Sequence, residues 1–211
     1  MGVELGFRGF ACDRTTEDGA DEIYMLVFCR RGGATFSSRL PRDLPQQELG
    51  HWDMNDGGQG WKSAVVPYSG DAHGINDGVL LTLDGNLKDG ESVEIQVIIM
   101  EEDGGNTKKL QEVGSQVLQQ TGDPYAVATG VILGALTNLG FNILADTDDF
   151  IGSFGVKVVG VGGGRIRADW KRGDSVTISQ PDPEHKNDRN RNEFRFNGSG
   201  SNYVGWFWVT R

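Results

Sequence analysis

The stretch Ile95-Gln96-Val97-Ile98-Ile99-Met100 decides the fold, because this apolar run leads directly into three acids, Glu101-Glu102-Asp103. A short apolar run bounded by polar residues is typical of a buried strand. A second acidic cluster, Asp146-Thr147-Asp148-Asp149, stands directly before Phe150-Ile151-Gly152. We therefore expect both acidic clusters to lie at one end of a β-sandwich, with the chain between them leaving the sandwich as a helical excursion.

Length and composition predict a single β-sandwich domain over residues 1–211. A chain of 211 residues and 23.0 kDa fits one domain, or one domain with a large insertion. The hydrophobic content of 37% is low, but the apolar residues gather in short runs, which favours a packed core over disorder. The 32 glycines follow no collagen-like period, so they indicate turns between many short strands.

Charge is distributed unevenly along the chain. Residues 1–156 carry 10 Lys and Arg against 24 Asp and Glu, a formal charge of −14, whereas residues 157–211 carry 10 against 6, or +4. The acidic part disfavours a nucleic-acid partner, whose phosphates need cationic neutralisation. It also disfavours an anionic membrane, unless a bound cation reverses the local field. Simple solubility is the alternative explanation of the acidic excess.

The chain has two cysteines, Cys12 and Cys29. If residues 3–12 and 22–30 form a hairpin, the two thiols lie at opposite ends of it, too far apart for a disulfide. We expect free, mostly buried thiols, which suits a reducing compartment. The first residues show no basic region followed by an apolar stretch, so no secretory signal is visible. The sequence therefore leaves the localisation open between the cytoplasm and export by a route that needs no signal.

Apolar and alternating runs predict about eight strands. Nine segments show this pattern, 3–11, 23–28, 79–83, 92–100, 154–158, 165–170, 175–179, 194–196 and 203–209, and residues 63–68 could form a further short strand. We expect a tight polar connection to join 79–83 to 92–100, and a closing hairpin to join the last two strands. Residues 30–63 predict a long loop with at most short strands. Its His51, Trp52 and Trp61 either pack on the sandwich or contact a ligand or partner.

The excursion, residues 104–145, predicts an α-helical hairpin at about 106–145. Asn106-Thr107 can cap a first helix that ends at Gly122, and Asp123-Pro124 begins a second. The apolar positions of the first helix share one face: Leu110, Val113, Val117 and Leu118. Residues 124–145 form an uncharged stretch that is long enough to cross a bilayer. Acidic flanks without Lys or Arg favour a helix packed on the protein over a membrane-inserting or oligomer-forming one.

The acidic loops indicate a divalent cation. Ca²⁺ takes about six to eight oxygen ligands from carboxylates, carbonyls and water. Loops 13–22, 101–103 and 146–149 could bring several carboxylates to one end of the sandwich, where a cation would relieve their mutual repulsion. Because these three loops contain no His or Cys, Zn²⁺ and copper fit poorly. The alternative is that the acidic loops stay solvated.

Three of these motifs resemble those of C2 domains, a family of calcium-binding β-sandwiches. Asp18-Gly19-Ala20-Asp21-Glu22-Ile23-Tyr24 is similar to the first calcium loop, Glu101-Glu102-Asp103 to the Asp-x-Asp after an apolar strand, and Asp149-Phe150-Ile151-Gly152 to the segment that closes that loop. The resemblance departs from the family where residues 104–148 intervene and where Glu101 replaces Asp. It implies the metal ligands Asp18, Asp21, Glu101, Asp103 and Asp149, with Asp13, Glu22, Asp146 and Asp148 as additional candidates.

The function that follows is a non-enzymatic Ca²⁺-binding C2-like module, which engages a protein partner or, in a Ca²⁺-dependent manner, a membrane. The alternatives are a self-assembling structural protein, which pairs through edge strands, its Gly-rich surface or its helices, and a membrane-inserting effector that uses residues 124–145. Catalysis is disfavoured, because none of the three histidines stands beside an evident nucleophile. The Gly160–Gly164 run lacks the partners of a phosphate-binding loop and predicts a tight turn.

Overall fold

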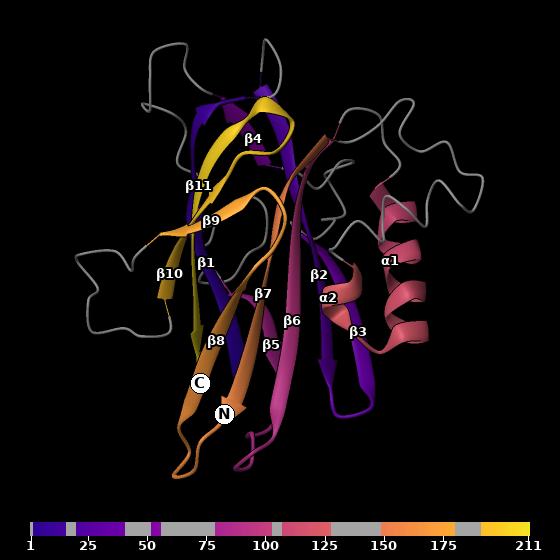
Figure 1. The fold of residues 1–211 in the computed structure, drawn as a ribbon, viewed down its shortest axis with the longest axis vertical. Coiled ribbons are helices and arrows are strands. Elements are labelled where there is room, and N and C mark those ends of the chain that lie inside the picture. Colours follow the sequence, from indigo (N-terminus) through magenta and orange to yellow (C-terminus); the bar gives the residue numbers. More distant parts are fainter. Residues whose placement is uncertain are drawn as a thin grey trace, which may run out of the picture.

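The computed structural model describes residues 2–15, 20–40, 52–55, 79–102, 107–127, 149–179 and 191–211. These residues are mostly β-strand and form two antiparallel sheets (Figure 1). The mostly β, antiparallel class predicted from the sequence is therefore confirmed.

The first sheet has five strands in the order β5-β1-β11-β10-β9. Their bounds are β1 Val3–Arg14, β5 Val79–Leu83, β9 Val176–Ser179, β10 Arg191–Phe196 and β11 Asn202–Thr210. The strands β10 and β11 pair as the predicted closing hairpin, with Phe194 opposite Gly205. The N-terminal and C-terminal strands β1 and β11 also pair, so the two ends of the chain stabilise one another's strands.

The second sheet has six strands, with β3-β2-β6-β7-β8 in a row and β4 paired with β2 beside β3. Their bounds are β2 Ala20–Arg31, β3 Ala34–Leu40, β4 Trp52–Asn55, β6 Ser92–Glu101, β7 Asp149–Gly160 and β8 Ile166–Arg172. The central strand β6 is buried at every position from Ile95 to Glu101, which explains its continuous apolar run.

The main core lies between the two sheets, because its buried side chains come from both. Phe154 of β7 stacks on Phe194 of β10 at 4.3 Å between ring centroids and lies 4.4 Å from Phe207 of β11. Alternate residues of β2 and β6, such as Val27 and Val97, join the same cluster. Burying these aromatic and branched side chains supplies most of the favourable free energy of folding.

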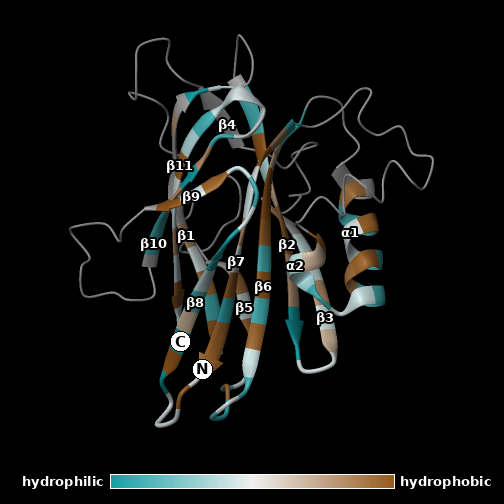
Figure 2. Ribbon diagram, viewed as in Figure 1, coloured by the Kyte–Doolittle hydropathy of each residue, from teal (hydrophilic) through white to brown (hydrophobic). Residues whose placement is uncertain are grey.

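A second core lies on the other face of the six-stranded sheet, under the helix α1 (Thr107–Thr121). The four predicted apolar positions of this helix are all buried against Tyr24, Leu26 and Phe28 of β2 and Ile98 and Met100 of β6. Figure 1 shows α1 beside β3, and Figure 2 shows hydrophobic and hydrophilic residues both present along it, as one buried face requires. The predicted stop at Gly122 is confirmed: its φ is +63° and its N–H donates to the carbonyl of Leu118 at 2.8 Å.

The second helix begins as predicted, since the Asp123 side chain accepts from the N–H of Tyr125 and Pro124 occupies the first turn. The described part, α2, is Pro124–Ala126, and the rest of the predicted helix to 145 lies outside the described residues. Within the described ranges no helix is long and apolar enough to cross a membrane.

Two strand pairings considered from the sequence do not form: a hairpin of residues 3–12 with 22–30, and one through the polar connection from 79–83 to 92–100. The strands β1 and β2 belong to different sheets, as do β5 and β6, so each connection carries the chain from one sheet to the other. The reason is that β1 finds a better-matched neighbour in β11, which pairs along almost its whole length. The loop predicted for 30–63 was also incomplete, because β3 forms a seven-residue strand after a two-residue turn at Gly32-Gly33. The strand predicted at 63–68 lies outside the described residues.

Candidate functional site

Three of the predicted ligand residues lie at one end of the six-stranded sheet, on adjacent strands. Glu101, the last residue of β6, is directly opposite Ile23 of β2 on one side and Asp149 of β7 on the other. Asp21 precedes Ile23 by two residues on β2. The long apolar pairing of β2, β6 and β7 sets this register, because a slip of one residue would expose the core face.

These three carboxyl groups belong to the same face of the sheet. Directly opposed residues of an antiparallel pair point to one face, and residues two apart on a strand do so too. Asp21 and Glu101 are fully buried between the sheets, and Asp149 is half-buried. Burying neighbouring carboxyl groups is costly unless hydrogen bonds or a cation compensate.

Asp21 has such a compensating partner on the opposite sheet. The phenol of Tyr203 on β11 donates a hydrogen bond to Oδ2 of Asp21, across 182 residues of sequence. Tyr203 is fully buried and lies opposite Cys12 of β1. Burial first, and then the hydrogen bond to Asp21, raise the pKa of the Tyr203 phenol far above its usual range. Asp21 therefore helps to join the two sheets at this end.

The other predicted ligands are placed only in part. Glu22 follows Asp21 on β2 and belongs to the opposite face, and its carbonyl accepts from the N–H of Glu102 at 3.0 Å. Asp13 lies in a register irregularity of β1, and its side chain is outside the described part of the chain. Four further candidates lie outside the described residues: Asp18, Asp103, Asp146 and Asp148. Among the residues that the structure does describe, no group of three or more His, Cys, Asp or Glu is arranged to hold a metal ion.

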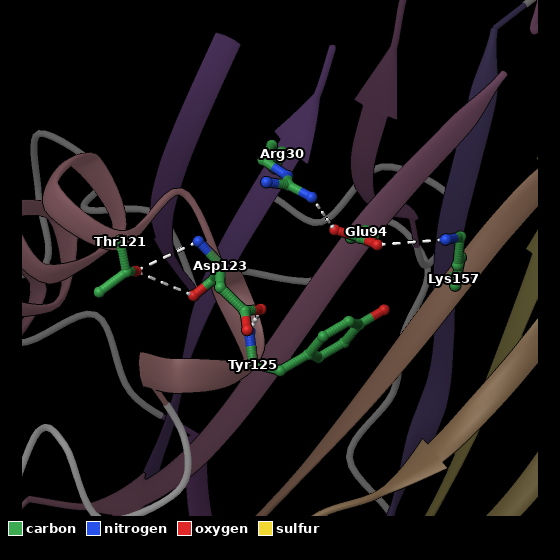
Figure 3. Close-up of polar contacts among 6 residues, drawn as sticks. All are labelled: Arg30, Glu94, Thr121, Asp123, Tyr125 and Lys157. Carbon is green, nitrogen blue, oxygen red and sulfur yellow. Dashed lines mark hydrogen bonds and ion pairs between the residues drawn. The ribbon is translucent and has the colours of Figure 1, made fainter. Parts of the chain in front are cut away.

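A row of alternating charges crosses the other face of the same sheet and was missed by the sequence analysis. Arg30 of β2 donates to Glu94 of β6 at 2.7 Å, and Lys157 of β7 lies 3.4 Å from the second oxygen of Glu94 (Figure 3). Asp169 of β8 stands opposite Lys157 and pairs with Arg167 at 2.9 Å. Polar residues at alternate positions were the available signal, but they do not reveal which strands are neighbours.

Tyr125 of α2 anchors the helical excursion beside this row. Its ring lies on Gly155 of β7, where a Cβ atom would come within 2.4 Å of the ring, and Nζ of Lys171 is 3.8 Å from the ring centroid. In Figure 3 the phenol extends toward the side chains of Glu94 and Lys157. Burial, followed by the negative charges of Glu94 and Asp123, raises the pKa of Tyr125 above its usual range. The absence of a side chain at Gly155 is what admits the ring.

A polar cleft of about 490 Å³ opens next to the row. It is lined by Arg30, Arg31, Gly32, Glu91, Ser92 and Glu94. Its two guanidinium groups are already engaged within the chain, Arg30 with Glu94 and Arg31 with the carbonyls of Asp84 and Asn86. Through these bonds the guanidinium groups have a structural role. The bonds of Arg31 hold the end of β2 to the connection between β5 and β6.

The prediction of free, buried thiols is confirmed for both cysteines. Burial raises the pKa of the Cys29 thiol to about 12, so this thiol remains protonated and unreactive near neutral pH.

Comparison of the chain with protein-family models, with curated proteins and with solved structures gave no match.

Proposed function

We propose that this protein is a non-enzymatic, Ca²⁺-binding β-sandwich module of C2-like type, in which the helical excursion is an insertion between two strands. The observation that carries the proposal is the register that brings Asp21, Glu101 and Asp149 to one end and one face of three adjacent strands. Oxygen ligands from strand ends and their adjoining loops suit a hard cation such as Ca²⁺.

The three carboxyl groups do not complete a metal site by themselves, and Tyr203 already occupies one oxygen of Asp21. In this proposal Asp18, near Asp21, and Asp103, near Glu101, supply further oxygens. Asp146 or Asp148, which precede Asp149, supplies another. Cation binding would neutralise a strongly acidic part of the chain. That change in charge would couple Ca²⁺ to the affinity for a protein partner or an anionic membrane.

The decisive experiment is thermal unfolding of chelator-stripped protein with and without Ca²⁺. A ligand at one hundred times its Kd stabilises the folded state by about 2.7 kcal/mol. For a chain of this size that corresponds to an increase in Tm of about 5–10 °C. The double variant Asp103→Asn, Asp149→Asn should lose the increase, and Mg²⁺ should reproduce little of it.

Asp169→Asn is the matched control, because Asp169 is a carboxylate on the opposite face of the same sheet, paired with Arg167. It should leave the Ca²⁺ effect unchanged. Equal Tm values in Ca²⁺ and in chelator would refute the proposal, and an unaltered response of the double variant would refute the ligand assignment. Co-sedimentation with phosphatidylserine vesicles, with and without Ca²⁺, then distinguishes a membrane from a protein partner.

A further inference from the structure

The strand β3 forms one end of the six-stranded sheet and offers a backbone edge. Its pairing partner is β2, from Met25 opposite Leu40 to Arg31 opposite Ala34. Among the residues that the structure describes, no strand pairs with the other edge of β3. Such an edge presents N–H and C=O groups that can accept another strand.

The turn between β2 and β3 determines which residues present these groups. Because Gly32-Gly33 is a two-residue turn, Arg31 and Ala34 form the hydrogen-bonded pair that closes the hairpin. Hydrogen-bonded positions then alternate along the strand, so Ala34, Phe36 and Ser38 direct their backbone groups toward β2. Thr35 and Ser37 direct theirs outward.

The chemistry of this edge differs from that of the opposite edge of the sheet. From Ala34 to Ser38 the strand β3 has no charge and no proline. The strand β8, at the other end, carries Arg167, Asp169 and Lys171 at alternate positions, together with Arg172. Charged side chains are a common means of preventing edge-to-edge pairing. The edge of β8 is therefore protected in a way that the edge of β3 is not.

Phe36, in the middle of the open edge, is 45% exposed, and within the described ranges it is the one exposed large hydrophobic residue. It stands opposite Cys29, which is buried in the main core, so its ring belongs to the core-facing side of the sheet. On the other side, Oγ of Ser37 lies 2.7 Å from Oγ of Ser115 on α1, which holds β3 in place. A strand fixed in this way loses little conformational entropy when another strand pairs with it.

We propose that β3 is a docking edge for a second copy of this chain, which pairs antiparallel about a two-fold axis at Phe36. Thr35 of each copy then stands opposite Ser37 of the partner subunit, and these are the residues whose backbone groups point outward. The two Phe36 rings meet at a non-hydrogen-bonded position, where side chains are closest. The edge is self-complementary in this register, which is what a closed symmetric dimer requires.

The charges of the edge agree with this register. Its one charged residue, Arg39, is three positions from the axis, so the two Arg39 residues of a dimer stand about 20 Å apart along the strands. A single pair of seven-residue strands buries less surface than a permanent dimer usually does, so the equilibrium should depend on concentration.

The first test is disulfide trapping of Phe36→Cys. Opposed non-hydrogen-bonded residues have Cα atoms about 4.5 Å apart, within the range that a disulfide needs. Mild oxidation should convert Phe36→Cys to a covalent dimer, while the buried Cys12 and Cys29 stay reduced. Thr177→Cys is the matched control, because Thr177 is an exposed residue of the edge strand β9, and it should remain monomeric.

The second test is sedimentation equilibrium over a range of concentrations. The parent protein should rise from 23.0 kDa toward twice that mass, Phe36→Lys should stay at 23.0 kDa, and Thr177→Lys should behave as the parent does. A parent that is monomeric throughout, or equal trapping of the two cysteine variants, would overturn the proposal. Because Phe36 is not one of the proposed ligands, running both tests in chelator keeps this result separate from the Ca²⁺ experiment.

Discussion

At the scale of single residues, the contact with the clearest consequences is the hydrogen bond from Tyr203 to Asp21. Both side chains are completely buried and they come from different sheets. A buried carboxyl group is costly unless it is hydrogen-bonded. The pair therefore fixes how the two sheets meet at the end where the candidate ligands lie.

We expect Tyr203→Phe to reduce the free energy of unfolding by about 1–3 kcal/mol, because it removes a donor from a buried carboxyl group while keeping the ring. Urea denaturation at pH 7 measures the loss. A double-mutant cycle with Asp21→Asn supplies the control. If the two residues interact, Tyr203→Phe should cost less stability in the Asp21→Asn background than in the parent. Additive effects of the two substitutions would contradict an interaction between them.

The same pair predicts a dependence on pH. The folded-state pKa of Tyr203 is raised above its ordinary value of 10.0, so the folded protein holds this proton after the unfolded chain has released it. The contribution of this proton to the free energy of unfolding is fully present below pH 10. It is lost as the pH rises above 10, at about 1.4 kcal/mol per pH unit. Between pH 10 and 11, Tyr203→Phe should therefore lose less stability than the parent does.

At the scale of elements, α1 shows how a helix and a sheet fit together through a glycine. A Cβ atom at Gly114 would lie 2.3 Å from the ring of Phe28 on β2. The helix therefore approaches the sheet more closely here than any larger residue would allow. Gly114 lowers the intrinsic stability of the helix by about 1 kcal/mol relative to Ala, which the packing must offset.

We expect Gly114→Ala to destabilise the protein by a net of about 1–2 kcal/mol, although the same change usually strengthens a helix, because the added methyl group overpacks the core. Chemical denaturation measures the change. Gln116→Ala, at an exposed position of α1, should alter stability by less than about 0.5 kcal/mol. If Phe28→Leu did not relieve the effect of Gly114→Ala, the explanation by contact with the ring would fail.

At the scale of the whole molecule, aromatic side chains join the two sheets. Phe154 of β7 contacts the rings of Phe194 and Phe207 from the other sheet and is completely buried. Dense packing of this kind leaves no room for rearrangement when a ring is removed. The contact between the sheets therefore depends strongly on this one residue.

We expect Phe154→Ala to cost about 3–5 kcal/mol of stability, because it leaves a cavity between the sheets. The matched control is the same substitution at Phe36, which is 45% exposed and should lose far less when the protein is dilute. Thermal unfolding of both variants makes the comparison. Similar losses at the two positions would mean that the core does not lie where the ring contacts place it.

Most of the strands and the first helix could be placed approximately from the sequence, because alternation and helical spacing are local properties of the chain, whereas β3 and β4 fall in a segment predicted as a loop. The apolar run 95–100 became the centre of a sheet, and Leu110, Val113, Val117 and Leu118 became the buried face of α1. The prediction that Asp21, Glu101 and Asp149 share one end of a sheet also held.

The neighbour of each strand was decided only by the tertiary structure. Alternation fixes which face of a strand is buried but not which strand lies beside it, so a pairing of β1 with β2 was open from the sequence, whereas the structure places them in different sheets. The hydrogen bond between Asp21 and Tyr203 spans 182 residues, and no local pattern predicts it. Local sequence determined where the strands and the acidic residues are, whereas the packing of two sheets around one core decided which of them meet.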